Sequence, residues 1–143
     1  MRFHQLDVTN VESIRRLADY IRKTHGGLDI LINNAAIAFK TNDVTPFGDQ
    51  AEITAQTNFF GTINVCNALF PLLRDHARFV VVVSFIHKID SYEELFFFLS
   101  RVVNVSSRAG MLESITNSEI RRQLTAPNAT IENVSDILSD FIR

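Results

Sequence analysis

The sequence predicts an α/β fold built on a parallel β-sheet, and three segments carry that prediction. Residues 28–36 form an apolar run that ends in two amides and two alanines. Residues 101–107 form a β-branched run that ends in two serines. A helix-like stretch precedes the first run, and a strand, a helix and a strand within roughly thirty residues are typical of a βαβ unit.

The amino-terminal region contains the first strand and helix of that expected unit. Residues 2–6 are predicted to form a short strand, and residues 7–10 a turn that supplies a helix cap. A helix should follow and end at Gly26-Gly27, since glycines favour left-handed C-terminal caps. Apolar residues recur along it at intervals of three and four: Val11, Ile14, Leu17, Ala18 and Ile21. Charged residues fill the other face, which we interpret as solvated.

The second strand runs into Asn33, Asn34, Ala35 and Ala36. In open parallel sheets a ligand lies beyond the carboxyl ends of the strands, where small residues allow close approach and amides supply hydrogen bonds. An Asn-rich turn without a ligand is the alternative interpretation. A polar loop at 40–46 and a long helix at 51–73 are predicted next.

Two further polar positions stand out against apolar surroundings. Asn58 comes just before Phe59 and Phe60 in the predicted long helix, where an amide has no packing role. A capping or solvent-facing amide is the alternative. Ser106 and Ser107 follow the third predicted strand, and serines at that place also serve as helix caps or loop residues.

Four motifs occur in order: Asp7-Val8, then residues 33–36, 57–62 and 103–107. Together they resemble the short-chain dehydrogenase/reductase family, and within it the carbonyl reductases. The likeness spans residues 2–78 almost without a gap. It implies an incomplete Rossmann-like, doubly wound parallel sheet with a helical tail, in which residues 1–143 form a single incomplete domain.

The resemblance also implies an NADPH-dependent reduction of ketones, aldehydes or quinones. The positions matching Asp7 and Val8 contact the adenine ring of the cofactor. The positions matching Asn33, Asn34 and Ala35 close over the nucleotide ribose, with Asn34 nearest the cofactor. Ala36 stands where the family usually has glycine, which is a mild departure.

For the reaction itself, the resemblance assigns two catalytic positions. The residue matching Asn58 holds a water in a proton relay, and the residue matching Ser107 hydrogen-bonds the substrate carbonyl. Phe39, Lys40 and Gln50 match positions on the substrate side of the cleft.

Two parts of such an enzyme are missing from the 143 residues. Hydride transfer to a carbonyl leaves an alkoxide that must be protonated, and the family uses a tyrosine followed four residues later by a lysine. Here Tyr20 is followed by Thr24, and Tyr92 by Phe96. No Gly-rich turn for a pyrophosphate is present either. The hypothesis is therefore the middle of an enzyme; the alternative is a catalytically inactive splice or gene-model product, at most an interaction module.

Residues 79–101 stand where the family passes directly from helix to strand. They predict a strand at 79–86 and an apolar helix or strand at 92–100, neither with an obvious partner. Because Arg78 and Arg101 bracket the stretch, we interpret it as a translated intron; a true insertion forming a hairpin is the alternative. The first of its strands could take the central position in the sheet and displace the strand that carries Ser107.

The remainder, 108–143, has a helical pattern. A short helix is predicted at 118–124, and Thr130 or Asn128 can cap a second helix. One apolar stripe runs along that helix: Ile131, Val134, Ile137, Leu138, Phe141 and Ile142. Carbonyl reductases resemble this, with a helical insertion that covers the surface other members use to dimerise. The implied parent enzyme is monomeric, whereas this chain could self-associate.

The composition of the chain limits the classes of partner and ligand that we expect it to bind. A net charge of -2 gives no basic patch for nucleic acid. Cys66 stands alone and the four histidines are scattered, so no metal site is expected. No signal peptide or membrane span is predicted, so the expected location is cytoplasmic. The expected partners are NADPH and a small-molecule carbonyl substrate.

Overall fold

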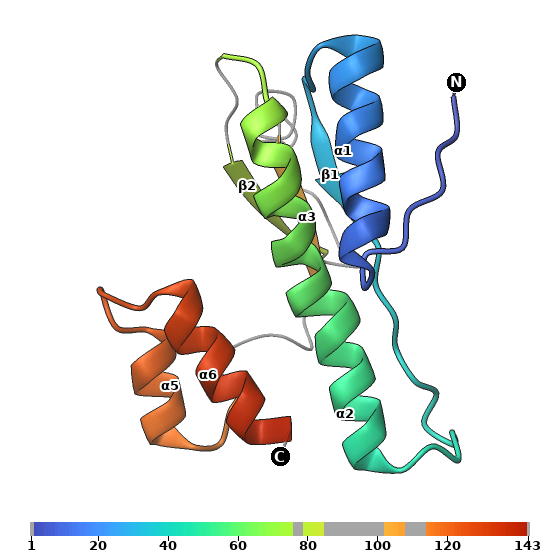
Figure 1. The fold of residues 1–143 in the computed structure, drawn as a ribbon. Helices are drawn as coiled ribbons and strands as arrows, with labels where there is room; N and C mark the ends of the chain where they lie inside the picture. The colour runs from blue at the N-terminus through green and yellow to red at the C-terminus, as the bar shows by residue number, and fades with distance from the viewer. Residues whose placement is uncertain (1, 76–78, 85–101, 108–113, 143) are drawn as a thin grey trace.

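The computed structural model describes residues 2–75, 79–84, 102–107 and 114–142 (Figure 1). The predicted apolar element at 92–100 lies outside these residues. The described elements are α1 (Val11–His25), β1 (Leu31–Asn33), α2 (Phe47–Ala55), the π-helix η1 (Gln56–Phe60), α3 (Gly61–Leu69), the 3-10 helix η2 (Phe70–Leu72), β2 (Phe79–Ser84), β3 (Val102–Ser107), α5 (Ser118–Leu124) and α6 (Ile131–Ile142).

The strands form a parallel sheet in the order β1-β3-β2, as predicted for a parallel α/β fold. Leu31 pairs with Val102, and Asn33 with Asn104. β2 pairs with the opposite edge of β3, from Phe79 with Val102 to Ser84 with Ser107.

The possibility that the inserted strand displaces the serine-bearing strand is therefore wrong. β3 keeps its ladder with β1, and the longer ladder of β2 uses the other edge of β3. Both strands thus belong to one sheet. The predicted lack of a partner for this strand is also wrong for its described part, because residues 79–84 pair with β3.

The predicted strand at residues 2–6 is not formed. None of these residues pairs with a described strand, and Phe3 is 92% exposed. His4 instead lies over the ring of Tyr20 on α1, with 5.1 Å between ring centroids. A strand needs a neighbouring strand to form a ladder, and residues 2–6 have none among the described strands. The βαβ unit accordingly lacks its first strand among the described residues.

α1 begins and ends as predicted. The side chain of Asn10 accepts a hydrogen bond from the Ser13 amide at 2.9 Å, and the backbone of Gly26 is left-handed with φ 71°. Its N–H donates to the Arg22 carbonyl. These contacts satisfy backbone groups that a helix end would otherwise leave unpaired.

The elements α2, η1, α3 and η2 form one continuous helical column from Phe47 to Leu72 (Figure 1). The column starts before the predicted residue 51, because the Gln50 amide already donates to the Pro46 carbonyl at 3.0 Å. Its middle contains a π-helical turn, which periodicity did not predict.

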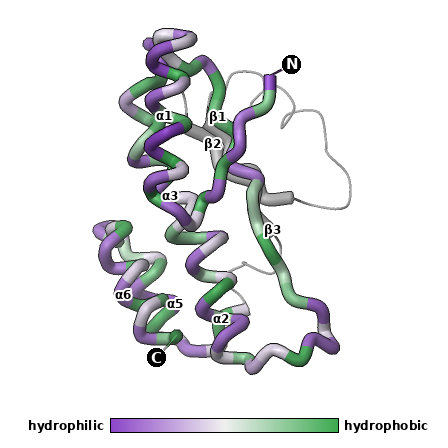
Figure 2. Tube along the Cα trace, turned by 45° about the vertical axis from the view of Figure 1, so that its right-hand side comes forward, coloured by the Kyte–Doolittle hydropathy of each residue, from purple (hydrophilic) through white to green (hydrophobic). Residues whose placement is uncertain are grey.

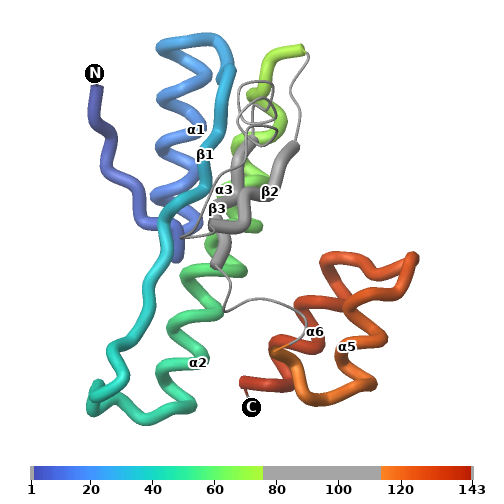
Figure 3. The backbone as a smooth tube through the Cα atoms, turned by 180° about the vertical axis from the view of Figure 1, so that it is seen from behind, coloured from blue at the N-terminus to red at the C-terminus, as the bar shows by residue number. Residues whose placement is uncertain are grey.

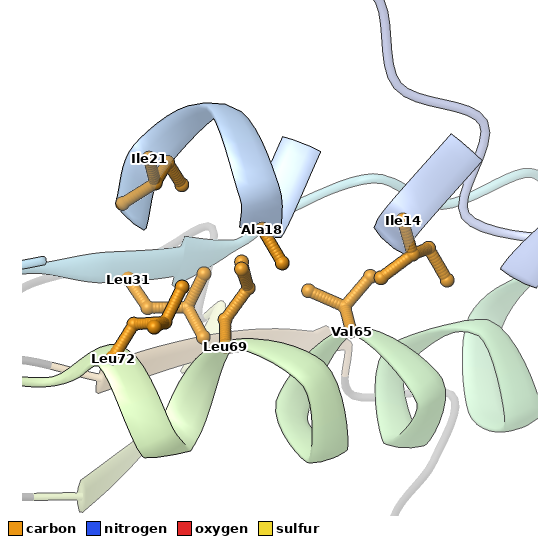
Figure 4. Close-up of a cluster of buried hydrophobic side chains, with 7 residues drawn as sticks. All are labelled: Ile14, Ala18, Ile21, Leu31, Val65, Leu69 and Leu72. Atoms are coloured by element: carbon orange, nitrogen blue, oxygen red, sulfur yellow. The ribbon is translucent and has the colours of Figure 1, made fainter. Parts of the chain in front are cut away.

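The core lies between α1, β1 and the second half of the column (Figure 4). Ile14 and Leu69 are its most enclosed side chains, at 1% and 2% exposure. Its members are Ile14, Ala18, Ile21, Leu31, Val65, Leu69 and Leu72. Seen from behind, the described helices leave the other face of the sheet uncovered, and Ile32 of β1 is 52% exposed (Figure 3).

The helices α5 and α6 pack against each other, and α6 touches α2, apart from that core (Figure 1). The bounds of α5 agree with the prediction, and α6 follows Thr130, whose hydroxyl accepts from the Asn133 amide. Neither helix contains a fully buried residue. Polar and apolar residues are interspersed along both (Figure 2). None of the helices in the described ranges combines the length and the apolar character that crossing a bilayer requires.

Candidate functional site

The candidate site lies where the segment after β1 meets the π-helix η1. The side chain of Asn58 bonds both backbone groups of Ile37. Its Oδ1 accepts from the Ile37 amide at 2.9 Å, and its Nδ2 donates to the Ile37 carbonyl at 2.9 Å. One amide side chain therefore sets the path of the chain as it leaves the sheet.

The π-helical turn itself is part of this arrangement. Such turns are rare and often occur at functional sites, because the extra residue re-aims side chains without breaking the helix. The Gly61 amide donates to the Gln56 carbonyl, and the Thr62 hydroxyl donates to the Asn58 carbonyl at 3.0 Å. The backbone around Asn58 is thus held on both sides.

Gly61 lets the helical column approach the turn before α1. A Cβ atom at this position would lie 3.0 Å from the Val8 carbonyl oxygen and 3.1 Å from its Cγ2. The distances leave no room for a side chain without a shift of the Val8 backbone. Gly61 therefore brings the Asp7-Val8 turn against the helical column that carries Asn58.

Asp7 forms an internally bonded turn at this junction. Its carboxylate accepts from the Thr9 hydroxyl at 2.7 Å and from the Thr9 amide at 2.9 Å. These bonds hold the pKa of Asp7 below its ordinary value. The Asp7 amide donates to the hydroxyl of buried Ser13 at 3.0 Å. The result is an exposed, ionised carboxylate in a fixed position.

The residues at and after the end of β1 differ in their exposure to solvent. Asn33 is half-buried, and its Nδ2 lies 3.3 Å from the Cys66 sulfur on α3, so it ties strand to helix. Burial raises the pKa of the Cys66 thiol, and the bond from Asn33 opposes that rise. Asn34 and Ala35 are exposed. These two are therefore accessible to a ligand.

Ser107 is the last residue of β3, at the carboxyl end of the central strand. β1 and β3 are parallel, and Asn33 pairs with Asn104. The residues that follow both strands therefore lie at the same, carboxyl-terminal end of the sheet. The backbone therefore places Ser107 at the end of the sheet where Asn34 and Ala35 follow β1.

The three residues expected on the substrate side of the cleft lie in the loop after β1 and in the first turns of α2. Phe39 is half-buried and Lys40 is exposed in the loop that leads from β1 to the far end of α2 (Figures 1 and 3). Gln50 lies in the first turns of α2, and its Nε2 donates to the Thr45 carbonyl at 2.7 Å. The structure uses Gln50 to shape this loop and does not bring it to the strand ends.

Sequence reasoning missed three contributors to the site. Ile37 acts through its backbone alone, so its side chain gives no signal. Gly61 stands inside a motif already noted, and a glycine in the middle of an apolar helix indicates close backbone approach. Ser13 is a polar residue on the buried face of α1, which the apolar spacing made detectable.

No group of three or more metal-ligating side chains occurs among the described residues. A cavity of about 410 Å³ lies between α5 and α6, lined in part by Arg122, Asn133 and Asp140. None of its lining residues belongs to the candidate site.

A family model described as enoyl-(acyl carrier protein) reductase, one of the short-chain dehydrogenase/reductase models, matches residues 1–95. The chain belongs to the short-chain dehydrogenase/reductase family. Carbonyl reductase [NADPH] 1 from Bos taurus is 58% identical over 84 residues, which are 59% of this chain and 30% of that protein. The protein of the same name from Sus scrofa is 57% identical over 142 residues, 99% of this chain and 41% of its own length.

Solved structures of this family share the fold. Menthone neomenthol reductase from Mentha piperita superposes with a TM-score of 0.71 at 25% identity, covering 97% of this chain and 53% of its own. Salutaridine reductase from Papaver somniferum gives 0.72 at 24% identity, covering 98% and 51%. The chain thus spans less than half of these curated relatives and about half of these solved structures.

Proposed function

We propose that this chain is part of an NADPH-dependent carbonyl reductase that converts ketones, aldehydes or quinones to alcohols on an incomplete, Rossmann-like doubly wound sheet. The names of its relatives at 57–58% identity support the reaction class. The observation that supports the proposal most directly is the pair of hydrogen bonds between Asn58 and Ile37. These bonds hold the segment after β1 at the carboxyl-terminal end of the sheet, where Ser107 also lies.

The residues present fit the adenosine half of a nicotinamide nucleotide. The ionised, exposed carboxylate of Asp7 can accept from the amino group of an adenine ring, with the Val8 backbone beside it. Asn34 and Ala35 are small and exposed at the strand end, where a ribose can approach. When bound, the cofactor supplies the hydride.

Within the reaction, we assign Ser107 to orient the substrate carbonyl and Asn58 to position the segment around it. Both polar groups of the Asn58 side chain already bond Ile37. A relay water could use the second lone pair of Oδ1 or the second N–H of Nδ2. The 143 residues contain no tyrosine with a lysine four positions later, so the alkoxide would lack its proton donor.

The second candidate is a chain without catalysis, a splice or gene-model product that acts at most as an interaction module. The insertion at 79–101 favours it. We expect the isolated chain to bind the nucleotide weakly and to turn over no substrate.

Nucleotide binding by two matched variants tests the proposal. Asn58→Asp keeps the acceptor but removes the donor to the Ile37 carbonyl, and we expect NADPH affinity measured by calorimetry to fall about tenfold, or ~1.4 kcal/mol. Asn67→Asp changes the same chemistry at an exposed position of α3 and should leave affinity unchanged. A folded chain that binds no NADPH would contradict the nucleotide assignment.

Turnover separates the two candidates. We expect no oxidation of NADPH with menadione by the purified chain. Turnover that Ser107→Ala abolishes would instead establish catalysis by these residues and would remove the second candidate.

A further inference from the structure

Within the described part of the chain, Ser13 is the one polar side chain that is buried. It is 6% exposed and lies on the apolar face of α1, directly before Ile14 of the core. A buried hydroxyl costs free energy unless it is hydrogen-bonded, and alanine at this position would avoid that cost and favour the helix more. Packing and helix propensity therefore do not explain a serine here.

The cap of α1 does not explain this serine either. Asn10 is the N-cap residue, and Ser13 stands at the third helical position, from which a side chain commonly reaches back to the amide of the N-cap. Here the Asn10 amide donates to the Asp7 carbonyl at 3.2 Å instead, and the Ser13 Oγ accepts from the Asp7 amide at 3.0 Å. The hydroxyl of Ser13 is thus directed to the turn before the helix.

These contacts hold both the backbone and the side chain of Asp7. Its amide bonds Ser13 and its carbonyl bonds Asn10, so both backbone groups are tied to the start of α1. Its carboxylate accepts from the hydroxyl and the amide of Thr9 at 2.7 and 2.9 Å. The Ser13 amide also donates to Asn10 Oδ1 at 2.9 Å. Because α1 packs in the core, the Asp7 carboxylate has a fixed position relative to that core.

We propose that Ser13 is a positioning residue that gives the nucleotide site its preference for an adenine base, by holding the backbone of Asp7. This inference rests on the proposed function, in which the Asp7 carboxylate accepts from the amino group of adenine. Hydrogen bonds are directional, so an acceptor that is already held in place loses less freedom on binding than one that must first be ordered. Ser13 is too enclosed to touch the base and acts through Asp7.

Two nucleotides that differ at one group measure this preference. The hypoxanthine analogue of NADPH has a carbonyl oxygen where adenine has its amino group, and a carboxylate repels that oxygen. We expect the whole chain to bind NADPH about tenfold more tightly than the analogue in NMR titrations. In Ser13→Ala we expect this ratio to fall to about threefold or less, through weaker binding of NADPH. A variant that only destabilised the fold would weaken both nucleotides equally and keep the ratio.

Further substitutions show whether the hydroxyl is the cause. Ser13→Thr keeps the hydroxyl and should retain the wild-type ratio. Ser13→Cys supplies a weaker acceptor of similar size and should give an intermediate ratio. Ser135→Ala is the matched control, because it removes a hydroxyl that donates to the Ile131 carbonyl within α6, and it should leave the ratio unchanged. Amide exchange without nucleotide gives an independent measurement, in which the Asp7 N–H should exchange faster in Ser13→Ala.

The outcomes separate this inference from the proposed function. If the wild-type chain prefers NADPH and Ser13→Ala keeps the full preference, the role of Ser13 is overturned and the proposed function stands. Equal losses in Ser13→Ala and Ser13→Thr, or unchanged exchange of the Asp7 N–H, would overturn it as well. A wild-type chain that binds both nucleotides equally, or neither, would contradict the assignment of Asp7 to adenine and the role of Ser13 with it.

Discussion

The helices α1 and α6 have the same amphipathic pattern and different surroundings. Both place apolar residues at intervals of three and four along one stripe. In α1 the stripe is enclosed, with Ile14 at 1% and Ala18 at 5% exposure. In α6 the stripe is only partly covered, and Ile131 and Phe141 remain 60% and 64% exposed.

The difference lies in what each helix packs against. α1 has β1 and α3 on its apolar side, and the three elements exclude water from one cluster. α6 has the short helix α5 and one side of α2. Periodicity therefore predicts that a helix forms, while the amount of burial depends on the neighbouring elements.

Side-chain truncations in the core and on α6 should show the largest difference in unfolding free energy between the two regions. Leu69→Ala removes an enclosed side chain, and we expect the free energy of unfolding to fall by about 2–5 kcal/mol. Phe141→Ala should change it by less than about 1 kcal/mol, because the ring is mostly solvated already. Urea unfolding at one fixed protein concentration measures both. Equal losses would show that α6 is as well packed as α1.

Gly61→Ala tests the close approach that supports the site. The new Cβ would meet the Val8 carbonyl at 3.0 Å, so we expect a loss of about 1–3 kcal/mol in unfolding free energy. Amide exchange at the Asp7-Val8 turn should accelerate. Gly48→Ala is the control, because nothing lies within 4 Å of its Cβ, and it should be neutral or stabilising. Equal effects would mean that Val8 yields without strain.

The helix caps allow the two regions to be compared with identical chemistry. Asn10 caps α1 and Asn117 caps α5, each through its side-chain oxygen. Asn10→Ala should lower the unfolding free energy by about 1 kcal/mol, because α1 is part of the core. Asn117→Ala should fray α5 in amide exchange and leave the main unfolding transition nearly unchanged. A shift of that transition by both would show that α5 unfolds together with the core.

The smallest effect concerns the pH dependence of the Asp7 turn. Its bonds from Thr9 lower the pKa of Asp7 in the folded chain, so their stabilisation is present above the ordinary aspartate pKa of about 4 and is lost as pH falls through the lowered value. The Thr9 amide resonance should move in that acid range. Asp7→Asn should abolish the movement, and a shift that persists in this variant would assign it to another group.

Several elements were predictable because their signals are local. The cap at Asn10, the stop at Gly26 and the bounds of α5 follow from side chains that bond or terminate the backbone within a few residues. The strand predicted at 2–6 was wrong, since strand formation depends on a neighbouring strand and none of the described strands pairs with these residues. The hydrogen bonds of Asn58 with the Ile37 backbone also escaped prediction, because they join residues that are distant in the chain.

By itself, the chain's sequence determined which segments become helices, where the polar ends of the strands fall, and that the residues belong to the short-chain dehydrogenase/reductase family. Only the tertiary structure decided that β3 stays central, that β2 takes the outer edge, and that Asn58 holds the Ile37 backbone. The physical reason is range: propensity and capping act over a few neighbouring residues, whereas strand order and side-chain clamps depend on groups that meet only after the chain has folded.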